Sequence, residues 1–123
     1  MLKILINRLI KNNYSGEKVK SKEEKGLLKS YDKAIKSNPD NPNSYFNRGN
    51  LKFKLGDYLG AMKDYNTAIK LNPEYLQAYH SRAIIKERLD YYNGAIADYN
   101  FILKIDSLDP LAHKNKNIIQ QRF

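Results

Sequence analysis

The sequence repeats itself at a fixed interval, the one that separates Tyr45 from Tyr79, and the repeat needs no gap to align. Residues that coincide after this shift are Tyr45 with Tyr79, Arg48 with Arg82, Tyr58 with Tyr92, Ala61 with Ala95, Asp64 with Asp98, Tyr65 with Tyr99 and Asn66 with Asn100. The match continues upstream, where Tyr31, Ala34, Ile35, Asn38 and Pro39 fall on Tyr65, Ala68, Ile69, Asn72 and Pro73. A period of this length indicates an array of similar units that stack on one another.

Each period contains two runs whose apolar residues recur with helical spacing. In the central copy these runs are 45–55 and 58–71. Gly56 between them can adopt the left-handed conformation that ends a helix, and Asp57 can cap the next helix. Pro73 then ends the second helix, because proline lacks an amide donor and restricts the residue before it. The period therefore predicts a helical hairpin, although Asp90 replaces the glycine in the next copy and the glycine argument does not extend to that turn.

Small and aromatic residues occupy fixed places in the period. The small ones are Gly49, Ala83, Ala61, Ala95, Ala34 and Ala68, and the rings are Tyr45, Tyr79, Tyr31, Tyr65 and Tyr99. Small side chains let helices approach closely, and large rings fill the spaces between successive hairpins. We therefore assign these tyrosines to the core.

The period, together with Tyr45, Gly49, Ala61, Tyr65, Ala68 and Pro73, resembles the tetratricopeptide motif. The resemblance implies an all-α fold, a right-handed α–α superhelix of about three helical hairpins closed by a C-terminal capping helix. Its expected parts are a degenerate first repeat (1–41, with a long loop at about 12–23), repeats at 42–75 and 76–109, and a capping helix at 110–123. Departures from the family pattern are Arg48 and Arg82 for Leu, Lys52 and Lys86 for Tyr, Ile102 for Ala and Ser107 for Pro.

The arginine departures have a candidate partner sixteen residues later. Both full repeats carry the pair, Arg48 with Asp64 and Arg82 with Asp98. The first repeat has Tyr14 and Ser30 at these places. We predict a partly buried ion pair between the two helices of each full hairpin, with a structural role.

The two ends of a repeat stack need caps to stay soluble. The stripe expected on the C-terminal helix is Ala112, Asn115, Ile119 and Arg122, with Lys114, Lys116 and Gln120 facing water. The N-terminal stripe is Leu2, Leu5, Ile6, Leu9 and Ile10, which predicts a packing helix ahead of a polar loop.

In the tetratricopeptide family the first helix of each hairpin lines a concave surface. The resemblance therefore implies these groove residues: Asn43, Phe46, Asn47, Asn50, Phe53, Lys54, Gln77, His80, Ser81, Ile84, Glu87 and Arg88, with Leu111, Lys114, Asn115, Ile118 and Arg122 from the closing helix. Amide side chains can hydrogen-bond a peptide backbone, and apolar ones can seat its side chains. The alternative is that these are ordinary solvent-facing residues.

One branch of the family grips the C-terminal carboxylate of Hsp70 or Hsp90 with two Lys, two Asn and one Arg. The five places hold Asn12, Gly16, Asn47, Gln77 and Ser81 in one frame, and Phe46, Asn50, Ser81, Leu111 and Asn115 in the next. Only one place matches in each frame. A chaperone-tail clamp of that type is not expected, because the site lacks the cations that would neutralise a carboxylate.

Composition excludes several other classes of protein. With no cysteine and only two histidines, His80 and His113, the chain offers no convergent catalytic or metal-binding set, so we expect no enzyme activity, cofactor or metal. No apolar run is long enough for a membrane span, and the absence of cysteine is compatible with the cytoplasm.

Net charge is +9 and lies mostly at the ends. Residues 1–41 hold ten Lys or Arg against five acidic residues, residues 42–109 nine against eight, and residues 110–123 three against none. The leading interpretation is an adapter that holds a partner peptide or helix in its groove. The alternatives are nucleic-acid binding through the basic ends, and self-association through an imperfectly capped end, so that the chain is a monomer or a weak homo-oligomer.

Overall fold

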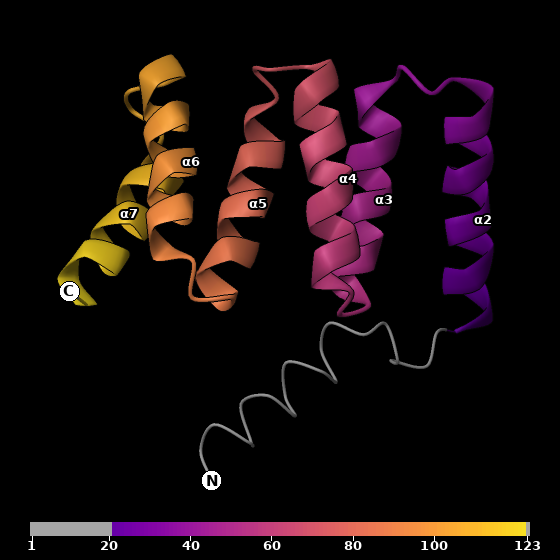
Figure 1. The fold of residues 1–123 in the computed structure, drawn as a ribbon, viewed down its shortest axis with the longest axis horizontal. Helices are drawn as coiled ribbons and strands as arrows, with labels where there is room; N and C mark the ends of the chain where they lie inside the picture. The colour runs from indigo at the N-terminus through magenta and orange to yellow at the C-terminus, as the bar shows by residue number, and fades with distance from the viewer. Residues whose placement is uncertain (1–20, 123) are drawn as a thin grey trace, which may run out of the picture.

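The computed structural model describes residues 21–122, which form six α-helices and no strand. The helices are α2 (Lys22–Ser37), α3 (Pro42–Lys54), α4 (Tyr58–Leu71), α5 (Leu76–Arg88), α6 (Tyr92–Ile105) and α7 (Pro110–Arg122). Each packs on the next along the chain. Figure 1 shows them as a row that runs from α2 at one end to α7 at the other. The predicted all-α stack of helical hairpins is confirmed.

The bounds of the helices repeat with the period of the sequence. The helices α3, α5 and α7 begin at residues 42, 76 and 110, and α4 and α6 begin at 58 and 92. Equivalent helices therefore start one sequence period apart, and they have the same length. The sequence period is a period of structure.

The turns inside the two complete hairpins have the same geometry despite different residues. Gly56 has φ 84° and Asp90 has φ 62°, so both adopt the left-handed conformation. Asp57 caps α4 as predicted, because its Oδ1 accepts a hydrogen bond of 2.9 Å from the amide of Gly60. Aspartate is among the few residues other than glycine that tolerate this backbone conformation, so the glycine of the motif is replaceable here.

The helix α2 begins at Lys22, so the predicted loop at about 12–23 ends earlier than expected. Ser21 and Glu24 form a capping box, in which the amide of Glu24 donates to Ser21 Oγ and the amide of Ser21 donates to Glu24 Oε1, both at 3.1 Å. This box fixes the first turn of α2. The predicted N-terminal packing helix and the rest of the predicted loop lie outside the described residues.

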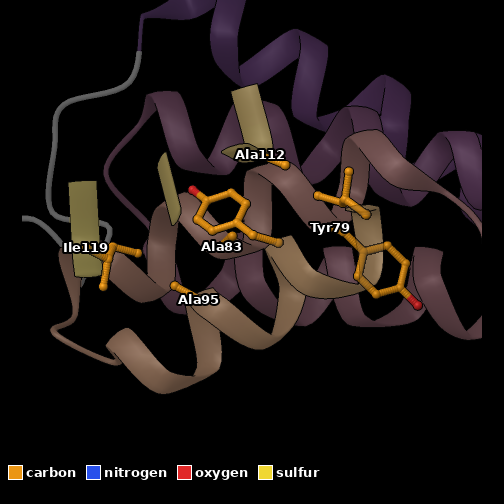
Figure 2. Packing of buried hydrophobic residues seen from close by; sticks show 7 residues of the cluster. Tyr79, Ala83, Ala95, Ala112 and Ile119 are labelled. Atoms are coloured by element: carbon orange, nitrogen blue, oxygen red, sulfur yellow. The ribbon is translucent and has the colours of Figure 1, made fainter. Parts of the chain in front are cut away.

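Small residues and rings interleave in the core, as the sequence predicts. The larger cluster is Tyr79, Ala83, Ala95, Tyr99, Ile102, Ala112 and Ile119 (Figure 2). A second cluster consists of Tyr58, Ala61, Tyr65 and Ile85. Among the tyrosines assigned to the core, Tyr31 and Tyr45 are only half-buried.

The closing helix α7 contributes to this core through two residues. Ala112 is 0% exposed and Ile119 is 1% exposed. Asn115 is half-buried, whereas Arg122 is exposed and does not belong to the packing stripe in which we expected it. The packing stripe of α7 is therefore shorter than predicted, but Ala112 and Ile119 pack in one cluster with Ala95, Tyr99 and Ile102 of α6.

Candidate functional site

A cavity of about 210 Å³ lies between α3 and α5. Its lining consists of Asn50 and Phe53 from α3, Tyr65 from α4, and Ser81 and Ile84 from α5. We call it the α3–α5 cavity. Of the groove residues predicted from the sequence, it brings together four, and Tyr65, which we had assigned only to the core, completes the lining.

Tyr65 adds a buried hydroxyl to the polar groups of the cavity, which also include Asn50 and Ser81. The ring is 1% exposed, and its hydroxyl donates a hydrogen bond of 2.5 Å to Asn50 Oδ1. Burial raises the pKa of Tyr65 to about 12, against the opposing effect of a hydrogen bond with Ser81. The phenol therefore stays protonated at neutral pH, and the amide group of Asn50 is held in place at the edge of the cavity.

The equivalent junction between α5 and α7 is built differently. The hydroxyl of Tyr99 donates to Glu87 Oε2 at 2.7 Å and accepts from Asn115 Nδ2 at 3.2 Å. Burial and the hydrogen bond with Glu87 raise the pKa of Tyr99. Because Glu87 stands one period after Phe53, a carboxylate at this junction replaces the ring that lines the α3–α5 cavity.

Two other predicted groove residues take part in packing. The ring centroid of Phe46 lies 4.9 Å from that of Tyr75. The guanidinium of Arg88 lies 5.1 Å from the ring centroid of Phe53 and donates a hydrogen bond of 2.6 Å to the hydroxyl of Tyr58. Arg88 thus supports the Phe53 ring from α5 through a cation–π contact.

His80 joins α5 to the start of α7. Its Nε2 lies 3.2 Å from Asp109 Oδ2, while Asp109 Oδ1 accepts a hydrogen bond of 2.8 Å from the amide of Ala112. Burial alone would raise the pKa of Asp109, but the hydrogen bonds from Ala112 and His80 lower it on balance. The contacts of His80 therefore indicate a structural role.

The remaining groove predictions fall on exposed side chains outside the lining of the cavity. These are Asn43, Asn47, Lys54 and Gln77, with Leu111, Lys114, Ile118 and Arg122 on α7. Their positions on α3, α5 and α7 follow from the repeat.

An ion network joins the two helices of the first complete hairpin. Arg48 donates from Nε and Nη2 to the two carboxylate oxygens of Asp64, at 2.9 and 2.7 Å, which confirms the predicted pair. The hydrogen bond with Asp64 raises the pKa of Arg48 further above its usual value. Lys52 also contacts Asp64, at 3.2 Å, and Arg48 reaches back to Asp32 on α2, at 3.0 Å.

The same network recurs in the second complete hairpin. Arg82 donates to both oxygens of Asp98, at 3.0 and 2.6 Å, and Lys86 lies 3.1 Å from Asp98. Arg82 also donates from Nη1 to Asn66 Oδ1 on α4, at 3.0 Å. Sequence reasoning identified the arginines and missed the lysines, although both lysines follow their arginine by four residues on the same helix.

The described part of the chain lacks two kinds of feature. Within residues 21–122, no group of three or more His, Cys, Asp or Glu is placed to hold a metal ion. None of the described helices combines the length and the apolar character that a membrane crossing needs.

A family model and a set of solved structures match this chain. The model of the tetratricopeptide repeat matches residues 42–75. A comparison with curated protein sequences finds no match.

The similar structures cover most of the chain. The first tetratricopeptide-repeat domain of Spaghetti (RPAP3), solved with the HSP90 peptide SRMEEVD, is 27% identical to this chain. The TM-score is 0.75 over 81% of this chain and 79% of that one. The first tetratricopeptide-repeat domain of human RPAP3 is 28% identical, with a TM-score of 0.73 over 80% of this chain and 77% of that one. A repeat protein from Parabacteroides merdae is 28% identical, with a TM-score of 0.76 over 80% of this chain and 38% of that one.

Proposed function

Because the chain belongs to the tetratricopeptide-repeat family, we propose that it is a protein-interaction module that holds a partner segment across α3 and α5. The α3–α5 cavity is the observation that carries this proposal. It lies between the first helices of two neighbouring hairpins. The segment is anchored there by one bulky apolar side chain.

The size and lining of the cavity define the anchor. An apolar cavity of about 150 Å³ is large enough for benzene, so a cavity of about 210 Å³ fits a side chain the size of Leu, Met or Phe. Phe53, Ile84 and the ring of Tyr65 supply apolar contact. Asn50 and Ser81 supply hydrogen-bonding groups for the main chain on either side of the anchor.

The residues at the places of the chaperone-tail clamp argue against a carboxylate as the main determinant. In the frame that begins at the second repeat, the clamp places are Phe46, Asn50, Ser81, Leu111 and Asn115, none of which is a cation. In the other frame, Asn12 and Gly16 lie outside the described residues. We therefore extend the proposal to a neutral anchor, unlike the acidic tail of the HSP90 peptide bound to Spaghetti.

A peptide selection tests the proposed site. Random peptides displayed on phage are selected on the wild-type chain and then compared on Ile84→Glu, which places a carboxylate in the cavity. The selected peptides should share one Leu, Met or Phe, and Ile84→Glu should weaken their binding at least about tenfold, because burying an unpaired charge is costly.

Leu59→Glu is the matched control. It makes the same change of an aliphatic residue to glutamate on α4, at a side chain that is 61% exposed and does not line the cavity. It should leave peptide binding unchanged, and both variants should keep the helical circular dichroism of the wild type. Peptides that bind wild type and Ile84→Glu equally would contradict the proposed site.

A further inference from the structure

One face of α2 carries apolar side chains that the described helices leave open. The face consists of Leu27, Tyr31 and Ala34. Their equivalents one and two periods later are Ala61 and Ala95, Tyr65 and Tyr99, and Ala68 and Ile102. All six equivalents are at most 1% exposed, whereas Leu27 is 43% exposed, Tyr31 is half-buried and Ala34 is exposed.

The first helix of each complete hairpin covers the equivalent face. A Cβ built on Gly49 of α3 would stand 2.9 Å from the ring of Tyr65, so α3 lies directly against this part of α4. The helix α2 holds the place of a second helix in its own hairpin, because it ends one period before the end of α4. Its covering helix must therefore come from upstream or from another molecule.

We propose that residues 2–10 of the same chain cover this face as a short helix. Its apolar stripe would be Leu2, Leu5, Ile6, Leu9 and Ile10. Nine helical residues extend about 13 Å, and Leu27 and Ala34 lie about 10 Å apart along α2, at about 1.5 Å per residue. The stripe is long enough to cover the open face.

The connection allows this placement. Residues 11–20 can span up to about 33 Å when extended, whereas α2 is about 24 Å long. Residues 2–10 can therefore reach any part of α2 from its start at Lys22. If the covering helix kept the register of the repeat, it would lie one period before α3, at 8–20, but after Ile10 that range is mostly polar and contains Gly16.

The covering helix thus departs from the register of the repeat. Leu27 stands where the complete hairpins have Ala61 and Ala95, and this larger side chain requires wider spacing between the helices. The long polar connection in place of a tight turn permits that spacing.

A second copy of the chain fits the face less well. Stable interfaces bury about 1,200 Å² or more in total, which three side chains of one helix cannot supply. A tethered segment also has an effective concentration of about millimolar or more, so it outcompetes a separate molecule at ordinary concentrations.

Thiol accessibility in the full chain tests the proposal. Because the chain has no cysteine, Leu27→Cys and Ala34→Cys each introduce one thiol on the face, and Lys29→Cys introduces one on the opposite side of α2. The thiols on the face should react with iodoacetamide about tenfold more slowly than the thiol of Lys29→Cys, since they react only when the cover opens. Two positions are used so that the result does not depend on one substitution being tolerated.

Changes in the N-terminal segment identify the cover. Adding Leu5→Glu/Leu9→Glu should raise the rate at both face positions to that of Lys29→Cys. The control Asn7→Glu/Lys11→Gln changes the net charge by the same amount at two positions outside the apolar stripe, one in the expected helix and one directly after it, and should leave protection intact. Equal rates at all three cysteines, protection that survives Leu5→Glu/Leu9→Glu, or protection that appears only at high protein concentration would each overturn the proposal.

Discussion

The substitution of glycine by alanine should have opposite effects at two helical positions of this chain. A Cβ added at Gly26 in α2 would meet no atom within 4 Å. At Gly49 in α3 the same atom would lie 2.9 Å from Cε1 and 3.1 Å from Cδ1 of Tyr65, and 3.2 Å from Cβ of Asp64. The two sites share the chemistry of the change and differ in the space around it.

The magnitude follows from two opposing contributions. Alanine is more favourable than glycine inside a helix by about 1 kcal/mol. At Gly49 this gain is offset by overpacking, which costs about 1–3 kcal/mol, because Tyr65 is buried and its hydroxyl is held by Asn50 at 2.5 Å. Ala83 occupies the equivalent position on α5, so the clash belongs to the spacing of α3 and α4 and is not a property of the repeat.

Urea denaturation followed by circular dichroism measures both effects. We expect Gly26→Ala to raise the free energy of unfolding by about 0.5–1 kcal/mol and Gly49→Ala to lower it by about 1 kcal/mol. The slope of the free energy of unfolding against urea concentration should equal that of the wild type, so that a shift of the midpoint reports a change in stability. If Gly49→Ala stabilised the chain as much as Gly26→Ala, the close packing argument at Tyr65 would be refuted.

Three further predictions concern charge and pH. Asp98→Ala should lower the free energy of unfolding by about 3 kcal/mol. The substitution removes a carboxylate that is only 5% exposed and leaves the cations of Arg82 and Lys86 without their partner. Asp32→Ala, at a carboxylate that is 61% exposed, should change it by less than about 1 kcal/mol, and equal losses in urea denaturation would contradict the network. Stability measured against pH should fall as the pH rises from 10 to 12, since the pKa of Tyr65 is about 12 in the folded chain and 10.0 otherwise, so the unfolded chain loses this proton first. Tyr65→Phe should make that part of the curve shallower, and an unchanged slope would be evidence against the assignment. The peptide SRMEEVD should bind no better by calorimetry than the same peptide with an amidated C-terminus, and a tenfold or greater preference for the free carboxylate would favour a clamp.

The spacing of the sequence was enough to predict the scaffold and its ion pairs. The pairs Arg48–Asp64 and Arg82–Asp98 were inferred from one shared offset and are observed at 2.7 and 2.6 Å. The lysines that join them were treated only as departures from the family pattern. Their signal was present, because residues four apart lie on one helical face.

The candidate site was only partly predictable. The repeat placed Asn50, Phe53, Ser81 and Ile84 on the facing helices, but it could not show that a cavity forms between them. Tyr65 was missed because its packing role is satisfied by the ring alone, whereas a buried tyrosine hydroxyl also needs a partner. The replacement of Phe53 by Glu87 at the second junction can be read from the sequence, but the hydrogen bond of Glu87 with the hydroxyl of Tyr99 cannot.

Each arginine of the ion networks also contacts the hairpin before its own. Arg48 reaches Asp32 on α2 and Arg82 reaches Asn66 on α4, both at 3.0 Å. A duplicated segment one period long would therefore contain its own cations and its own aspartate. The preceding hairpin would already provide an acceptor for its arginine. The chain can therefore gain or lose a whole period without leaving a charge unpaired, whereas an insertion or deletion whose length is not a whole period, made between an arginine and its aspartate, would change the offset that joins them.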